Sequence, residues 1–109
     1  MSLSTHVLDT ARGVPAAGID VRLTALEATP REIARGTTDV DGRISKPFGG
    51  ELAPGTYELR FFVRDYFEKR ETPSWFDEVP VRFTIRDAAA HHHVPLLLSP
   101  FGYSTYRGS

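Results

Sequence analysis

The chain has 109 residues, 13 Lys and Arg against 14 Asp and Glu, a formal net charge of -1, and no Cys. This length fits one domain covering residues 1–109. The missing Cys excludes disulfide scaffolds, thiol nucleophiles and Cys-ligated metal centres. The balanced charge argues against a nucleic-acid partner and a polybasic membrane anchor. The N-terminus shows no secretory signal. We therefore expect a cytoplasmic protein, or a periplasmic one where a leader has been removed.

Apolar and polar residues alternate over several short segments, which is the pattern of half-buried strands. The predicted strands cover residues 5–9, 19–25, 57–63, 81–86 and 91–99, with a last one after residue 102. Between them, Asp41-Gly42 is a strong tight-turn signal, because glycine accepts the positive φ that such turns require. Short strands separated by frequent Gly and Pro turns predict an all-β sandwich.

One segment, residues 64–71, departs from strand alternation and predicts a short helix. Val63, Tyr66, Phe67 and Arg70 have the spacing of one helical face. Thr72-Pro73 ends the segment, since a residue that precedes proline avoids helical backbone angles.

Three of the four histidines are contiguous, at residues 91–93. Strand alternation places His92 on the inner face, and His93 on the outer face together with Leu97. In the first strand, His6 and Leu8 face outward in the same way. Leucines on the outer face of a small sandwich suggest a buried subunit contact. Imidazoles in such a partly dry contact are suited to proton transfer near neutral pH.

Simpler interpretations of these residues are also open. A single histidine at a strand edge is often only structural, and two same-face histidines without a third ligand are weak evidence for a metal site. We therefore predict no bound metal. On spacing alone, Arg43 would be an ordinary turn residue, and Tyr106 and Ser109 would be ordinary residues of the C-terminal tail.

Longer motifs add to these patterns. Residues 3–10 with 12–16 are similar to the N-terminal signature of the transthyretin-like family, and residues 91–109 are similar to its C-terminal signature. Residues 38–43 match a third motif of that family. The ending Tyr106-Arg107-Gly108-Ser109 resembles that of its enzyme branch, the hydroxyisourate hydrolases, and differs from the hormone-carrying transthyretins.

The resemblance implies a transthyretin-like (prealbumin-like) β-sandwich of seven to eight strands with one short helix. It implies a homotetramer whose sites lie at the dimer–dimer interface. It further implies a cofactor-free reaction of urate and purine degradation. In that reaction, 5-hydroxyisourate is hydrolysed to 2-oxo-4-hydroxy-4-carboxy-5-ureidoimidazoline.

The same resemblance implies catalytic roles for His6, Arg43 and His93. It also implies that the substrate is bound by four residues: His6, Arg43, Tyr106 and Ser109. Hydrolysis needs a general base for water and a proton for the leaving nitrogen, which the two imidazoles can share in either order. Arg43 stays charged and can stabilise a developing oxyanion. The chain departs from the family at His92, where an aromatic residue such as Tyr is usual, and we expect this change to affect packing.

Two other functions compete with hydrolysis. A small-molecule binding or transport protein of the transthyretin type would keep the fold, but it needs neither the imidazole pair nor the Tyr-Arg-Gly-Ser ending. A structural module of the immunoglobulin-like class would be one monomeric domain in a longer string of domains.

Overall fold

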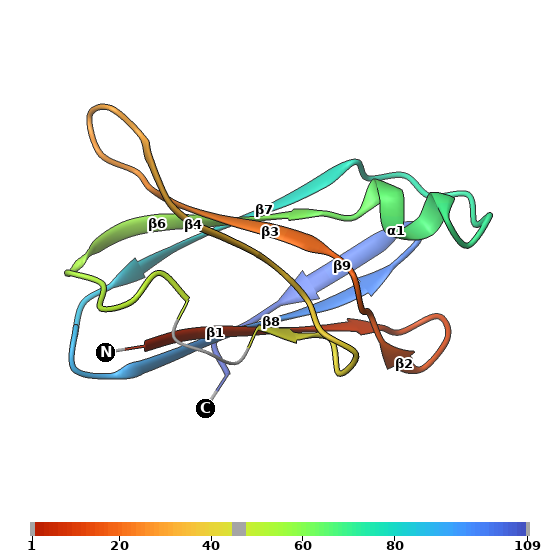
Figure 1. Cartoon of the computed structure of the whole chain (residues 1–109), viewed down its shortest axis with the longest axis horizontal. Helices are drawn as coiled ribbons and strands as arrows, with labels where there is room; N and C mark the ends of the chain where they lie inside the picture. Colours follow the sequence, from red (N-terminus) through yellow and green to blue (C-terminus); the bar gives the residue numbers. More distant parts are fainter. Residues whose placement is uncertain (1, 45–47, 109) are drawn as a thin grey trace.

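The computed structural model describes residues 2–44 and 48–108, which form two β-sheets packed face to face (Figure 1). One sheet has the strand order β2-β1-β8-β9, and β5 also pairs with β1. The other has the order β4-β3-β6-β7. The bounds of the first sheet are β1 (Ser2–Asp9), β2 (Val14–Pro15), β5 (Arg43–Ile44), β8 (His91–Ser99) and β9 (Gly102–Thr105). Those of the second are β3 (Asp20–Ala25), β4 (Arg31–Thr37), β6 (Gly55–Phe62) and β7 (Glu78–Ile85).

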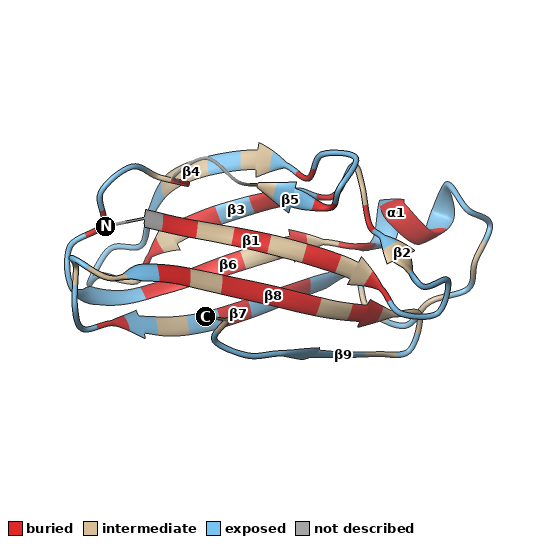
Figure 2. Ribbon diagram, turned by 90° about the horizontal axis from the view of Figure 1, so that it is seen from below, coloured by how far each residue is buried: buried red, intermediate tan, exposed pale blue. Residues whose placement is uncertain are grey.

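The core lies between the sheets and is built from alternate residues of each central strand. Figure 2 shows buried positions alternating with less buried ones along β1. Fully burying one large aliphatic or aromatic side chain contributes about 1.5–3 kcal/mol. The buried sets are Val21, Leu23 and Ala25 of β3; Tyr57, Leu59 and Phe61 of β6; and Val94, Leu96 and Leu98 of β8. The predicted all-β sandwich is therefore confirmed.

Strands β1 and β8 pair in parallel along their lengths, with Ser4 opposite His93 and His6 opposite Pro95. The Thr5 hydroxyl strengthens this pairing by donating to the Val94 carbonyl at 2.6 Å. Parallel neighbours need a long crossover connection, and here most of the chain lies between the two strands. The pairing brings the N-terminal and C-terminal motifs together in one sheet.

The single described helix, α1, spans Arg64–Glu68 and is shorter than the predicted residues 64–71. Its apolar face is confirmed, because Tyr66 and Phe67 are buried. The segment from residue 69 to 71 continues as a turn, in which the Thr72 amide donates to the Phe67 carbonyl at 3.0 Å. Glu71 then adopts a φ of 52°, in the left-handed region, so the helical path ends there.

Two features of the sandwich differ from the sequence prediction. The two-residue strands β2 and β5 bring the described strands to nine, and β4 forms an edge strand where no strand was predicted. Of the β4 residues only Ile33 is a large apolar residue, and it is partly buried. In the described part of the chain, no helix is long and apolar enough to cross a membrane.

Candidate active site

His6 and Arg43 lie side by side on the outer face of the first sheet. β1 and β5 pair antiparallel, with His6 directly opposite Arg43. Side chains in that relation have Cβ atoms about 4.5–5.5 Å apart. The half-buried His6 ring also hydrogen-bonds to the backbone carbonyl of Asp41, in the turn that precedes β5. This contact links the His6 imidazole to the same turn that positions the Arg43 guanidinium.

The turn itself is shaped by one carboxylate and one glycine. Oδ1 of Asp39 accepts hydrogen bonds from the Asp41 amide at 2.9 Å and from the Arg43 amide at 3.0 Å. Gly42 has a φ of 73°, and a Cβ there would collide with the Val7 carbonyl oxygen. The Asp-Gly signal therefore fixes where Arg43 leaves the turn and enters the sheet.

His93 reaches the same outer face from β8. Its Nδ1 lies 2.8 Å from the Ser4 hydroxyl of the neighbouring strand. Gly108 forms an isolated bridge with His93, and the Gly108 amide donates to the His93 carbonyl at 2.8 Å. A Cβ on Gly108 would lie 2.5 Å from Cδ2 of the His93 ring. Only glycine at this position lets the ring keep its place.

Burial and a shared cation set the protonation of the two imidazoles. Burial, followed by the positive charge of Arg43, lowers the pKa of His6 below its ordinary value of 6.5. Burial also lowers the pKa of His93, and the charges of Arg43, His6 and His91 lower it further. Both rings are therefore mainly neutral at pH 7, which is the form that accepts a proton.

The alternation argument for the histidines is confirmed. His92 is 8% exposed and faces the interior, whereas His93 on the outer face is half-buried. Burial and then the positive charge of Arg107 lower the pKa of His92. The outer-face leucines are half-buried as well, at Leu8 and Leu97.

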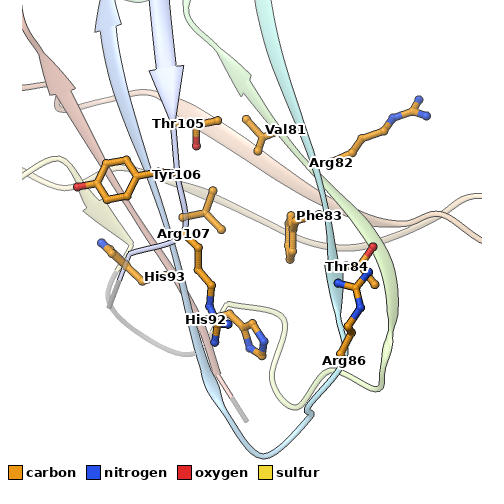
Figure 3. Close-up of a pocket in the computed structure, with 11 residues that line it drawn as sticks. Val81, Arg82, Phe83, Thr84, Arg86, His92, His93, Thr105, Tyr106 and Arg107 are labelled. Carbon is orange, nitrogen blue, oxygen red and sulfur yellow. The ribbon is translucent and has the colours of Figure 1, made fainter.

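Of the two C-terminal residues of the predicted site, the structure describes only Tyr106. Tyr106 follows β9 and is 58% exposed. In Figure 3 its ring and that of His93 lie on one side of β8, while Arg107 and His92 are directed to the other side. Ser109 lies outside the described residues. The structure thus brings His6, Arg43 and His93 together and places Tyr106 toward the His93 side of the strand.

A hollow of about 340 Å³ lies behind this face, between the sheet edges formed by β7 and by β8 with β9 (Figure 3). Its lining mixes apolar side chains with cations and includes Val81, Phe83, Arg86, His92 and Arg107. His93 and Tyr106 also line it, whereas His6 and Arg43 do not. Strand alternation had placed His92 on this inner side, but it gave no indication of the hollow.

Sequence reasoning missed Ser4. This residue shares the outer face of β1 with His6, two positions further along the strand, so alternation alone could have placed it there. The parallel register with β8 then puts its hydroxyl between His91 and His93. Within the described residues, no group of three or more His, Cys, Asp or Glu side chains is placed to hold a metal ion.

Comparison with known proteins identifies the family. The model of the HIUase/Transthyretin family matches residues 3–108. The chain belongs to this family. It is 52% identical over 114 residues to 5-hydroxyisourate hydrolase 2 of Rhizobium meliloti, an alignment that covers 98% of this chain and 95% of that relative. It is 48% identical over 113 residues to 5-hydroxyisourate hydrolase of Deinococcus radiodurans, with the same coverage of 98% and 95%.

Solved structures of the HIUase/Transthyretin family share the fold. Klebsiella pneumoniae 5-hydroxyisourate hydrolase superimposes with a TM-score of 0.89 at 36% identity and full coverage of both chains. Sea bream transthyretin in complex with thyroxine gives a TM-score of 0.92 at 26% identity, covering 99% of this chain and 95% of that one. The transthyretin-like resemblance is confirmed, and family membership replaces the immunoglobulin-like alternative.

Proposed function

We propose that this chain is a 5-hydroxyisourate hydrolase of urate degradation and works without a cofactor. The observation that carries the proposal is the grouping of two neutral imidazoles, His6 and His93, with Arg43 on one sheet face. Relatives at 52% and 48% identity carry the name of that hydrolase and support the same conclusion.

The chemistry follows from the charge states of these groups. One neutral imidazole takes a proton from water, whose oxygen attacks a ring carbonyl carbon of the substrate. The guanidinium of Arg43 binds the acidic substrate and stabilises the negative charge that develops on the carbonyl oxygen. The ring C–N bond then breaks, and the leaving nitrogen takes a proton from an imidazolium. The carbonyl becomes the carboxylate of 2-oxo-4-hydroxy-4-carboxy-5-ureidoimidazoline.

Tyr106 and Ser109 complete the proposed site as substrate-binding residues. The Tyr106 ring lies on the same side of β8 as the His93 ring, so its phenol is suited to orient the substrate by hydrogen bonding. For Ser109, the proposal rests on the family motif alone. It would contribute its hydroxyl.

We also propose a homotetramer in which the outer face of the first sheet meets a second copy. Arg43 and Tyr106 are exposed on one chain, and Leu8 and Leu97 are only half-buried. The hollow that His93 and Tyr106 line on one chain does not include His6 or Arg43, so a facing copy would supply the second wall around all four side chains. The proposed dimer–dimer interface would then form the site.

The competing function is a small-molecule carrier, favoured by the similarity to a transthyretin in complex with thyroxine. That similarity has 26% identity, below the values for the hydrolase relatives. A carrier requires a channel but no proton-accepting pair beside a cation.

A kinetic assay separates the two functions. Urate oxidase would generate 5-hydroxyisourate in situ, and the ultraviolet absorbance decay would be followed with and without catalytic amounts of the protein. We expect clear acceleration by the native chain and a loss of about 10²–10⁴-fold in His93→Ala. Arg31→Ala, an exposed β4 residue of the other sheet paired with Glu27, is the control. An unaccelerated decay with native protein would rule out the hydrolase.

A further inference from the structure

The hydroxyl of Ser4 lies between two imidazoles of the neighbouring strand. Ser4 Oγ is 2.8 Å from Nδ1 of His93 and 3.1 Å from Nε2 of His91. The two rings are close to parallel, with 14° between their planes and centroids 6.5 Å apart. The parallel register of β1 and β8, with Ser4 opposite His93, creates this arrangement. Ser4 is half-buried, so water competes less for its hydroxyl than at an open surface.

The direction of the Ser4–His93 hydrogen bond depends on the tautomer of His93. The Ser4 hydroxyl has one hydrogen, so it can donate to only one of the two ring nitrogens that it contacts. When it donates to Nε2 of His91, Nδ1 of His93 carries a hydrogen and donates to Ser4 Oγ. The backbone carbonyl of Ser4, whose proximity raises the pKa of His93, can only accept and favours the same arrangement.

The opposite edge of the His93 ring is constrained by Gly108, on the segment after β9. The backbone of Gly108 lies against Cδ2 of His93, close enough that an added Cβ would be 2.5 Å away. With Nδ1 on Ser4 and Cδ2 against Gly108, the remaining edge of the ring is the one with Nε2. A neutral imidazole protonated on Nδ1 has its lone pair on Nε2.

We propose that Ser4 is a positioning residue that holds His93 as the Nδ1–H tautomer, so that Nε2 of His93 is the general base of the reaction. This inference rests on the proposed hydrolase function and resolves which of the two imidazoles begins the proton transfer. The His93 imidazolium formed in this step then passes its proton to the leaving nitrogen, and His6, whose ring hydrogen-bonds to the Asp41 carbonyl, is left to bind the substrate.

The groups that face His93 determine how its titration responds to a change at Ser4. Arg43 on β5, His6 on β1 and His91 on β8 all lower the pKa of His93, and Tyr106 on the segment after β9 is the nearby phenol. An acceptor on Nδ1–H stabilises the imidazolium more than the neutral ring. Removing the Ser4 acceptor therefore lowers the pKa of His93 further, whereas removing a donor to Nδ1 would raise it.

The kinetic test uses Ser4→Ala, with Ser4→Thr as the conservative variant that keeps a hydroxyl. We expect Ser4→Ala to lower kcat roughly 3- to 10-fold with little change in KM, and to move the acid limb of kcat/KM to lower pH. Ser4→Thr should restore both. Ser74→Ala, which removes a hydroxyl from the segment between α1 and β7, is the matched control and should leave both unchanged.

Ring-nitrogen NMR provides a readout that does not depend on activity. In 15N-histidine-labelled protein at a pH where the imidazoles are neutral, we expect the native His93 ring to show protonated Nδ1 and unprotonated Nε2. Its signals would be assigned by their absence in His93→Gln, and this tautomer preference should weaken in Ser4→Ala.

Several results would overturn the role of Ser4. These are an unchanged kcat and acid limb in Ser4→Ala, an acid limb that moves to higher pH, and a native His93 ring protonated on Nε2. Native protein that fails to accelerate the reaction would instead refute the hydrolase function. The NMR spectra would still decide the tautomer in that case, so the two failures are distinguishable.

Discussion

At the scale of single residues, the site depends on how one cation affects two imidazoles. Arg43 lies opposite His6 in the sheet and lowers the pKa of both His6 and His93, after burial as the first cause. Below their lowered pKa the rings become charged and no longer accept a proton. In the proposed reaction, this arrangement would keep the base available at neutral pH while the guanidinium remains charged for the substrate.

The pH dependence of activity follows from these shifts. The active base is the neutral ring, so a lowered pKa places the acid limb of kcat/KM below pH 6.5, with a plateau at neutral pH. Arg43→Gln removes a positive charge, which raises the pKa of His93 and moves the acid limb to higher pH. It also lowers the plateau by about 10²–10³-fold.

Rates of the native chain and of Arg43→Gln measured across this pH range, with Arg31→Gln as the control, would test this expectation. An acid limb at the same pH in Arg43→Gln would show that Arg43 does not act on the imidazoles.

Gly108 tests how closely His93 must be held. Gly108→Ala would place a Cβ 2.5 Å from Cδ2 of His93, so the ring must shift from the position in which Nδ1 lies 2.8 Å from the Ser4 hydroxyl. We expect a loss on the order of 10²-fold in kcat, with little change in the melting temperature because Gly108 forms only an isolated bridge outside the named strands.

The control for Gly108 is Gly102→Ala, where the nearest atom to an added Cβ is an ordinary contact at 3.6 Å. Equal kcat in the two variants would contradict the positioning argument.

At the scale of elements, α1 stabilises the sandwich through the end of β1. The Tyr66 hydroxyl donates to Oδ2 of Asp9 at 2.8 Å, and Asp9 is only 1% exposed. The Arg12 amide donates to the other carboxylate oxygen at 3.0 Å. A five-residue helix is too short to be stable alone, so its packing and this bond keep it in place.

Tyr66→Phe removes one partner of a buried carboxylate. We expect it to lower the free energy of unfolding by about 1–3 kcal/mol, measured by urea denaturation. Catalysis should be almost unaffected under conditions where the protein stays folded, because Tyr66 does not touch His6, Arg43 or His93. Tyr103→Phe, at an exposed tyrosine, is the matched control, and a similar loss in both variants would show that the Asp9 contact adds nothing.

The elements also differ in how far sequence predicts them. The alternation of β3 is regular, and that of β6 is interrupted only by buried Glu58 and by Phe62; the inner faces of both strands meet the core, and both strands were predicted. β4 is an edge strand with a register shift against β3, between Leu23 and Thr24. Its burial is partial and irregular. Its sequence therefore lacks the alternation of apolar and polar residues that would have predicted a strand.

At the scale of the whole molecule, the proposed tetramer decides whether the site is enclosed. We expect light scattering to give a mass near four times that of the 12.1 kDa chain. Leu97→Glu places a charge on the outer face beside the proposed interface, which should lower this mass and reduce activity with it. Thr56→Glu on the exposed face of the other sheet is the control. A fully active monomer would contradict the interfacial site.

The sequence by itself determined the two sheet faces, the Asp41-Gly42 turn, the place of the helix and the site candidates His6, Arg43 and His93. These features depend on local periodicity, turn chemistry and motifs, which short stretches of chain contain. Only the tertiary structure decided the parallel pairing of β1 with β8, which joins Ser4 to His93 across 89 positions of sequence. That pairing results from burying both inner sheet faces at once, a condition that the alternation within one strand does not contain.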